Sequence, residues 1–277
     1  MTRDYKLADL IPWFAREITF VRSFANPEID RVFKAASNNI ARTDATVQTV
    51  AAAFYATQVA QRLVSSTSDK KTLIGSGLHA WQSAAGSSSP FSFGPAIDAA
   101  LRSFVVQAWT TFEVLAGDLW EAALNVHPKT LAELNGASDR SRDTGPRIAL
   151  GVLSKYDYDV TNKMGSILKN ELDCFGSLGG IRAAYRLAFS NDAADVLEPL
   201  DHEAFTVLWC VRELIVRRSS VVDERYEREA AASTLAPSGS RGEELLLDGK
   251  MLAELLSVGI MEVLKLFEAV DRWVATN

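Results

Sequence analysis

Residues 245–274 read LLLDGKMLAELLSVGIMEVLKLFEAVDRWV, and this stretch decides the fold class. Its apolar side chains recur at steps of three and four, a spacing that places them on one face of a helix. The stretch therefore predicts a long amphipathic helix in the C-terminal part of the sequence. The apolar stripe of this helix comprises Leu252, Leu256, Ile260, Val263, Phe267, Val270 and Val274.

Two further stretches repeat the same pattern. One opens at Gly94-Pro95, where proline suits the first turn of a helix, and the other spans roughly Asp201 to Arg218. Alternating runs of β-branched residues are few, so no substantial sheet is expected and the predicted fold class is all-α. The first stripe comprises Leu101, Phe104, Val105, Ala108, Phe112, Leu115 and Leu119, and the second comprises Phe205, Leu208, Val211 and Ile215.

Polar segments rich in glycine, serine and proline divide the chain. The segment Gly86–Pro90 is expected to separate an N-terminal helical region, residues 1–90, from a helical bundle, residues 94–277. The function of the N-terminal region is left unassigned. Its helices are predicted at roughly Leu7–Phe24 and Ala45–Val64, and further loops are predicted at Asn135–Pro146 and Ser233–Glu243.

Composition limits the classes of protein that fit this chain. Its 277 residues carry 29 Lys and Arg against 35 Asp and Glu, a formal net charge of -6. Phosphate affinity comes mainly from Lys and Arg, so a surface that binds nucleic acid everywhere is not expected, although a local basic patch remains open. No run approaches about 20 apolar residues, so we expect no membrane span and no membrane partner. The N-terminal residues do not resemble a signal peptide, and we predict a cytoplasmic protein.

The residue types that usually carry chemistry are sparse. Cys174 and Cys210 show no zinc-binding spacing, and we expect two reduced thiols in or near a core. His79, His127 and His202 lie far apart in sequence, so they predict no metal site. The nucleotide-binding, metalloprotease and hydrolase motifs are absent. We therefore predict no metal and no cofactor.

The most informative motif is residues 208–229, LWCVRELIVRRSSVVDERYERE. Arg212 has Leu208, Val211 and Ile215 as helical neighbours, so part of its side chain should be buried and should need a carboxylate or phosphate partner. Glu113 lies on a mostly uncharged helix surface, where a lone carboxylate is unfavourable unless it is paired. We therefore predict that Glu113 packs near Arg212 or caps a neighbouring helix.

An ordered set of segments resembles the HEPN superfamily. The segments are VVQAWTTFEVLAGDLWEAAL at 105–124, the helix end at Arg212–Arg217, SSVVDERYERE at 219–229, and the C-terminal stretch quoted above. The nearest branch reads arginine-asparagine, three variable residues, histidine, a few small or polar residues, and then an "IVDE" stretch. The resemblance covers about residues 94–275.

This resemblance implies a helical bundle, a homodimer and contact with RNA. Many HEPN domains are metal-independent ribonucleases of prokaryotic defence and toxin–antitoxin systems. In active members the arginine and histidine of an R-x4–6-H motif, contributed by two protomers, face one RNA cleft. The arginine binds the scissile phosphate and the histidine transfers protons.

This sequence departs from the family pattern at the catalytic positions. The family arginine maps onto Arg212, and the usual asparagine maps onto Glu213. The histidine maps onto Arg217 at spacing four, and onto Arg218 or Ser219 at spacings five and six. Arginine keeps its proton at all accessible pH values and cannot replace imidazole as a proton shuttle. The resemblance therefore predicts a motif without its proton-transfer residue.

Three interpretations remain open. The first is a degenerate, non-catalytic HEPN-like module that binds RNA or a partner protein, with Arg212, Arg217 and Arg218 facing phosphate. The second is a ribonuclease with altered chemistry, using Arg212 with Glu213 or with a histidine from elsewhere. The third is a structural or dimerisation module, in which Arg212 forms an internal salt bridge and the last two arginines complement the helix dipole. A basic surface could be extended by Arg140, Arg142 and Arg147.

Overall fold

The computed structural model describes residues 22–66, 94–128, 149–171, 174–189 and 194–276. Within these residues the regular structure is helical, and the one extended pairing is an isolated bridge between Val221 and Glu244. The predicted all-α fold class is therefore confirmed for the described part of the chain. The helices are α1 (Pro27–Ser66), α3 (Gly94–Val126), α5 (Leu150–Leu153), the 3-10 helix η2 (Ser154–Tyr156), α6 (Met164–Glu171), α7 (Leu178–Ala188), α8 (Ala194–Asp201), α9 (Glu203–Arg217), α10 (Glu224–Glu229) and α11 (Gly249–Thr276).

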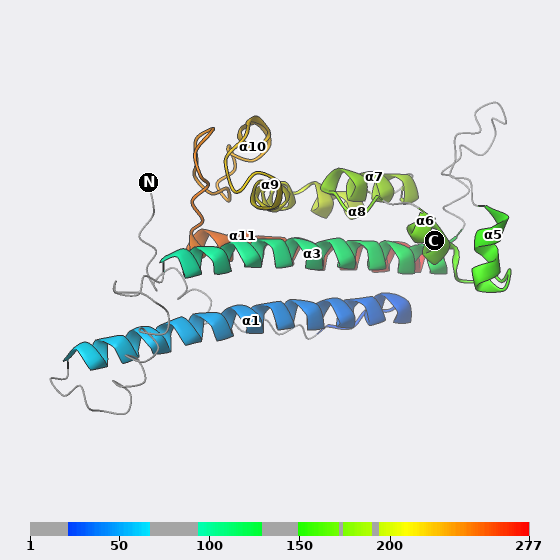
Figure 1. Cartoon of the computed structure of the whole chain (residues 1–277). Helices are drawn as coiled ribbons and strands as arrows, with labels where there is room; N and C mark the ends of the chain where they lie inside the picture. The colour runs from blue at the N-terminus through cyan, green and yellow to red at the C-terminus, as the bar shows by residue number, and fades with distance from the viewer. Residues whose placement is uncertain (1–21, 67–93, 129–148, 172–173, 190–193, 277) are drawn as a thin grey trace.

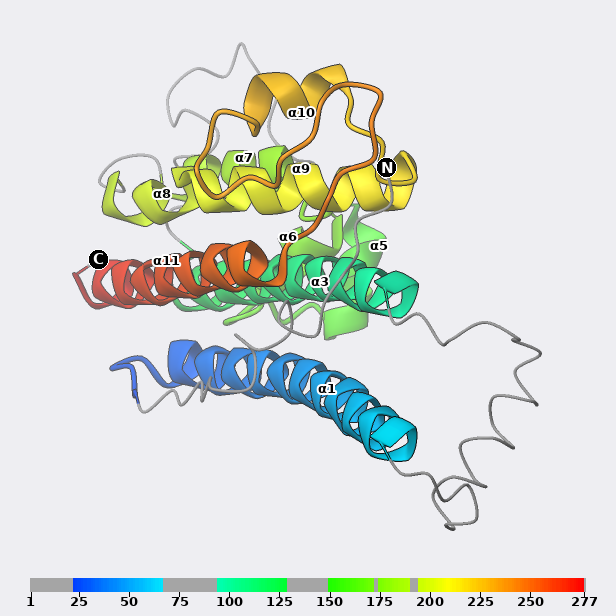
Figure 2. The same ribbon diagram turned by 90° about the vertical axis from the view of Figure 1, so that its left-hand side faces the viewer.

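The helices form three layers. Figures 1 and 2 show α3 and α11 side by side in the middle, α1 on one face of this pair, and α7 to α10 on the other. At the far end of the central pair, His127 Nε2 lies 2.8 Å from the carbonyl oxygen of Val274, so α3 and α11 run parallel. Phe205 and Trp209 of α9 meet Phe112 and Trp109 of α3 in reverse order, so these two helices run antiparallel.

The predicted apolar stripes form the interior. On α3 the stripe from Leu101 to Leu119 is buried except for Ala108, which is half-buried. On α11 and α9 most stripe positions are buried, whereas Leu256, Ile260 and Ile215 are only half-buried. Side chains from both outer layers join this interior in one cluster. The periodicity of the sequence therefore located the core correctly.

Helix α1 is longer than the sequence analysis predicted. It begins at Pro27, not near Ala45, and Asn26 caps its start by accepting bonds from the amides of Glu28 at 2.9 Å and Ile29 at 3.3 Å. An asparagine cap followed by proline in the first turn is a strong start signal. Within the helix predicted at Leu7–Phe24, residues 7–21 lie outside the described part of the chain, and residues 22–24 are not helical.

Helix α1 packs into the same core as the residues after 94. Phe24 and Phe33 pack against Phe267 of α11, with ring centroids 5.6 and 5.2 Å away. The amides of Ala25 and Asn26 donate to the carboxylate of Asp271 at 3.1 and 3.0 Å. The division into residues 1–90 and 94–277 stays a prediction, but α1 shares its apolar interface with the bundle.

The loop predicted at Ser233–Glu243 is present as a series of turns. The loops predicted at Gly86–Pro90 and Asn135–Pro146 lie outside the described residues, as do His79 and the arginines of the second loop. Across the part of the chain described here, no helix combines the length and apolar composition that a membrane crossing requires.

Two adjacent glycines at the start of α7 differ sharply in their surroundings. A Cβ on Gly180 would lie 1.8 Å from the carbonyl oxygen of Cys174, whereas a Cβ on Gly179 would meet nothing within 4 Å. Ser177 holds this close approach by accepting a hydrogen bond from the Gly180 amide at 3.1 Å. The start of α7 therefore lies against the preceding backbone with no space for a side chain at residue 180.

We expect Gly180→Ala to lower the free energy of unfolding by about 2 kcal/mol or more, because the new methyl group must displace backbone atoms. Gly179→Ala should leave it unchanged or raise it slightly, because alanine favours the helix and meets no neighbour. Urea denaturation of both variants beside wild type measures the difference. Equal stability of the two variants would contradict this account of α7.

Candidate functional site

The end of α9 is fixed by the turn that follows it. The amides of Arg218 and Ser220 both donate to the carbonyl oxygen of Leu214, at 3.0 and 2.8 Å. Ser219 and Ser220 adopt left-handed backbone conformations, with φ of 50° and 65°, and such residues end helices by closing this type of bond. The Leu245 amide then donates to the Ser220 carbonyl oxygen at 2.7 Å. The chain reversal after α9 is therefore held by backbone bonds.

The arginine corner is the group Arg212, Glu213, Arg217 and Arg218 at this helix end. Arg212 is mostly buried, with 21% of its side chain exposed, and its Nη1 pairs with Glu213. Its Cζ lies 5.5 Å from the ring centroid of Trp209, within range of a cation–π contact. Its Nε is buried and has no hydrogen-bond partner. The prediction of a partly buried Arg212 with a carboxylate partner is confirmed, but that partner is its sequence neighbour.

Glu213 joins two of the arginines. One of its carboxylate oxygens pairs with Arg212, and the other lies 3.0 Å from Nε of Arg217. Arg217 and Arg218 are 68% and 65% exposed, and Arg218 has a weaker partner in Asp223 at 3.7 Å. The corner therefore contains one buried cation and two exposed cations, each beside a carboxylate.

Among the described residues Glu113 forms no ion pair with Arg212, and the expectation that it packs near Arg212 or caps a neighbouring helix stays a prediction. Glu113 instead accepts a hydrogen bond of 3.0 Å from the indole Nε1 of Trp109, one turn earlier on α3. A buried tryptophan N–H needs an acceptor, and this carboxylate supplies it. Trp109 in turn packs on Trp209 with ring centroids 4.8 Å apart, and Arg212 lies over Trp209. Glu113 and Arg212 are therefore linked through these two tryptophans.

Sequence reasoning missed the role of Trp209. A second guanidinium, that of Arg225 from α10, lies 5.8 Å from the same ring centroid, and its Nε bonds Glu229 at 3.0 Å. Two arginines from successive helices thus share one indole. The available signal was the spacing of Trp209 one helical turn before Arg212, although no sequence spacing indicates Arg225.

Cys210 lies close to the arginine corner but offers no reactive thiol. Both cysteines are reduced thiols, as expected, and Cys210 is buried. Burial, reinforced by the nearby carboxylate of Glu229, raises the pKa of the Cys210 thiol to about 11. The thiolate is the nucleophilic form, so this cysteine stays protonated and inert at neutral pH.

The two described histidines lie away from the arginine corner. His202 caps the start of α9, where its Nδ1 accepts from the Ala204 amide at 3.1 Å. It therefore lies at the opposite end of the helix from Arg212. His127 bonds the carbonyl oxygen of Val274 and packs edge-on against Trp273. Neither imidazole can reach an atom bound at Arg212 within one protomer.

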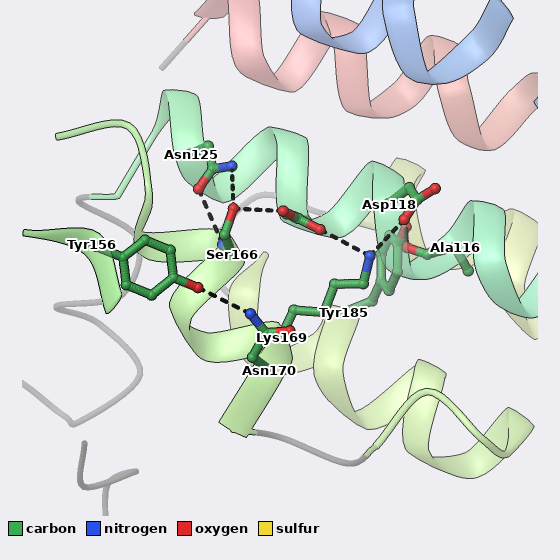
Figure 3. Close-up of polar contacts among 9 residues, drawn as sticks. Ala116, Asp118, Asn125, Tyr156, Ser166, Lys169, Asn170 and Tyr185 are labelled. Carbon is green, nitrogen blue, oxygen red and sulfur yellow. Dashed lines mark hydrogen bonds and ion pairs between the residues drawn. The ribbon is translucent and has the colours of Figure 1, made fainter. Parts of the chain in front are cut away.

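A second polar cluster joins α6 to α3 (Figure 3). Lys169 Nζ lies 2.5 Å from Asp118 and 2.8 Å from Glu121. Ser166 Oγ donates to the other oxygen of Glu121 at 2.5 Å and accepts from Asn125 at 3.1 Å. The carboxylates lie three residues apart on α3, and the lysine and serine lie three apart on α6, so one turn of each helix faces the other.

The chemistry of this cluster indicates a structural role. Burial lowers the pKa of Lys169, but its bonds to Asp118 and Glu121 outweigh burial, and the net shift is upward. Burial raises the pKa of Glu121, but hydrogen bonds from Lys169 and Ser166 outweigh it, and the net shift is downward. The lysine is therefore a poor nucleophile and the glutamate a weak base, and the cluster attaches α6 to α3.

The described residues also contain no group of three or more histidine, cysteine or acidic side chains placed to hold a metal ion. Comparisons with protein-family models, with curated proteins and with solved structures find no match to this chain. The geometry of the arginine corner is therefore the basis for its functional interpretation.

Alanine substitutions at Arg212 and Arg217 compare the contribution to stability of a mostly buried arginine with that of an exposed one. We expect Arg212→Ala to lower the free energy of unfolding by about 1–3 kcal/mol, because it removes the Trp209 contact and leaves Glu213 without its inner partner. Arg217→Ala should change stability by less than about 0.5 kcal/mol, because its exposed ion pair contributes little. Chemical denaturation measures both. A stable Arg212→Ala variant would refute the anchoring role of this arginine.

The polar cluster at Lys169 predicts that the free energy of unfolding depends on pH. The pKa of Glu121 is lower in the folded protein than its ordinary value of 4.5. Its stabilising contribution is therefore present above that value and is lost as pH falls through the folded pKa. We expect Glu121→Gln to be less stable than wild type at pH 7, and the gap to narrow as pH falls below 4.5. Unfolding curves across pH 3–7 test this, and a constant gap would contradict it.

Proposed function

We propose that the protein is a non-catalytic, HEPN-like helical module that binds single-stranded RNA through the arginine corner. The observation that carries this proposal is the exposure of Arg217 and Arg218, at 68% and 65%, beside an anchored Arg212. Phosphate contacts are made by exposed guanidinium groups held on a rigid element. Helix α9 is such an element, because its outer turn is tied by the bonds to Leu214.

Among the residues that the structure describes, no histidine lies at the arginine corner, and this supports binding without cleavage. Acid–base catalysis of RNA cleavage needs a group that exchanges protons near neutral pH, and arginine does not. Each carboxylate oxygen of Glu213 is engaged by an arginine. His127 and His202 are engaged elsewhere in the described residues. We therefore expect that RNA bound at the arginine corner is released uncleaved.

The surroundings of the corner fit an interaction surface. Val216 and Val221 are 53% and 38% exposed, and they flank Arg217 and Arg218 in sequence. Exposed apolar groups beside cations suit contact with unstacked bases or with a second protomer. We propose a homodimer that brings two corners to one RNA, as the HEPN resemblance implies, and a place in a prokaryotic defence or toxin–antitoxin type system.

A structural role is the second candidate, and one observation favours it. Every arginine between 212 and 228 has a carboxylate partner: Glu213 for Arg212 and Arg217, Asp223 for Arg218, and Glu229 for Arg225 and Arg228. These acids reduce the positive potential that would attract phosphate. In this case the protein is a dimerisation or scaffold module, and RNA affinity is low at every salt concentration.

RNA binding by matched arginine variants tests the proposal. We expect the double variant Arg217→Ala/Arg218→Ala to bind labelled single-stranded RNA about tenfold more weakly than wild type at low salt, because two phosphate contacts are lost. The dependence of log K on log salt should flatten by about 1.4 if each arginine contacts one phosphate of a single strand. Fluorescence anisotropy at several salt concentrations measures both quantities.

Two controls make this experiment decisive. Arg31→Ala removes an equally exposed arginine from α1, at 69% exposure, and should bind RNA as wild type does. Glu213→Gln removes the competing carboxylate and should bind RNA several-fold more tightly. Equal RNA binding by wild type and the double variant would support the structural role instead. Cleavage products that disappear in Arg212→Ala would support the ribonuclease interpretation.

A further inference from the structure

A second pair of exposed arginines lies on α10, beside the arginine corner. Arg225 and Arg228 are 47% and 64% exposed, and each pairs at 3.0 Å with a different carboxylate oxygen of Glu229. One acidic side chain therefore lies between two guanidinium groups. The arginine corner has the same arrangement on α9, where the two oxygens of Glu213 face two arginines. Each of these two helices thus presents a pair of arginines around one carboxylate.

Trp209 joins the two pairs into one surface. The Cζ atoms of Arg212 and Arg225 lie 5.5 and 5.8 Å from the centroid of its ring, so the distance between them cannot exceed the sum of these values. The hydrogen bond to Glu229 raises the pKa of Arg225 more than burial lowers it, and the charge of Glu213 adds to the increase. We call this surface the arginine row, which comprises Arg217, Glu213, Arg212, Arg225, Glu229 and Arg228.

The arginine row carries more positive than negative charge. Its four arginines share two carboxylates, and the neighbouring pair of Arg218 and Asp223 adds one charge of each sign. A carboxylate between two guanidinium groups occupies a position that also suits a phosphate, because both anions accept hydrogen bonds from the same N–H groups. Two such positions lie along the row, one on each helix. The row therefore suits a ligand with more than one phosphate.

The other two acids of α10 are engaged by a different arginine. Glu224 pairs with the side chain of Arg241 at 3.2 Å, and Glu227 accepts a hydrogen bond of 3.1 Å from the Arg241 amide. These carboxylates reduce the positive potential around the row without occupying it. The affinity of the row for phosphate must therefore come from direct contacts and not from attraction over a long distance.

The type of cation on this surface also favours phosphate. Between residues 208 and 247 the sequence contains six arginines and no lysine. A guanidinium group presents a planar fork of N–H donors that can bind two oxygens of one phosphate, and it can also stack on a base. A lysine ammonium group offers only a compact charge. The exclusive use of arginine therefore suits the phosphates and bases of a single strand.

We infer that Arg225 and Arg228 bind a further phosphate of the same RNA strand that contacts the arginine corner. This inference rests on the RNA binding proposed above. The strand extends from the end of α9 onto α10, and the phosphate takes the place of Glu229 between its two arginines. That carboxylate is 32% exposed, and ion pairs of this partly exposed kind contribute little to stability. The ligand is therefore a run of phosphates and not a single phosphate group.

RNA binding by variants of α10 tests this inference. We expect Arg225→Ala/Arg228→Ala to bind labelled oligouridine about tenfold more weakly than wild type at low salt. The dependence of log K on log salt should flatten by about 0.7, because one phosphate contact of a single strand is lost. Glu229→Gln should bind several-fold more tightly, because the neutral amide leaves both arginines available. Fluorescence anisotropy at several salt concentrations measures these quantities.

A charge-matched control and a second variant make the result decisive. Arg31→Ala/Arg186→Ala removes two arginines that are 69% and 54% exposed on α1 and α7, and it should bind RNA as wild type does. If the α10 double variant does not fold, Arg228→Ala alone should weaken binding several-fold. Unchanged binding by the folded α10 variants, beside weakened binding by Arg217→Ala/Arg218→Ala, would overturn this inference alone. Absence of RNA binding by wild type would overturn the proposed function and this inference together.

Discussion

The burial of α3 is the constraint on which the rest of the structure depends. Its buried positions include pairs that no single stripe can contain, such as Leu115 with Ala116 and Leu119 with Trp120. A helix that is apolar around most of its circumference must be covered on several sides. Helices α1, α9 and α11 provide that cover, and α6 and α7 cover its C-terminal half. The three layers follow from this requirement.

The polar groups of α3 determine how its neighbours dock. Trp120 donates its indole N–H to the Ala184 carbonyl oxygen at 3.0 Å, and the hydroxyl of Tyr185 donates to the Ala116 carbonyl oxygen at 2.8 Å. These reciprocal bonds fix α7 on one turn of α3. Asp118 emerges from the same turn and pairs with Lys169 of α6. Burial thus supplies the attraction, and these few bonds set the register.

The features that were predicted correctly from the sequence depend on local apolar periodicity. The predicted helix end near Arg218 and the apolar stripes of α3, α9 and α11 match the structure closely, because each is a property of consecutive residues. The start of α1 was missed although Asn26 and Pro27 signal it, because the polar stretch before Ala45 obscures the apolar spacing of Ile29 and Val32. Pairings between different helices had no such signal. The sharing of Trp209 by two arginines is one example, and the docking of Lys169 on α3 is another.

Glu113 shows why charge partners are harder to predict than burial. Its uncharged helical surroundings correctly indicated a carboxylate in need of a partner. The expected positions were beside Arg212 or at the end of a neighbouring helix, but a buried indole N–H on the same helix face satisfies the same need. Trp109 lies one helical turn before Glu113, so this spacing was visible in the sequence, but the position of the indole N–H was not. A single sequence does not contain that geometry.

The arginines of α9 differ in what holds them in place. Arg212 is confined between Trp209 and Glu213, so packing alone gives a reason for an arginine at that position. Arg217 and Arg218 are less confined, because their side chains extend into solvent and their ion pairs are of the weak, exposed kind. A structural role therefore accounts fully for the first arginine, whereas for the other two it offers only the helix dipole and these weak ion pairs. Their placement on the last turn of a firmly anchored helix is what a phosphate contact requires, so the case for binding depends on the exposed pair.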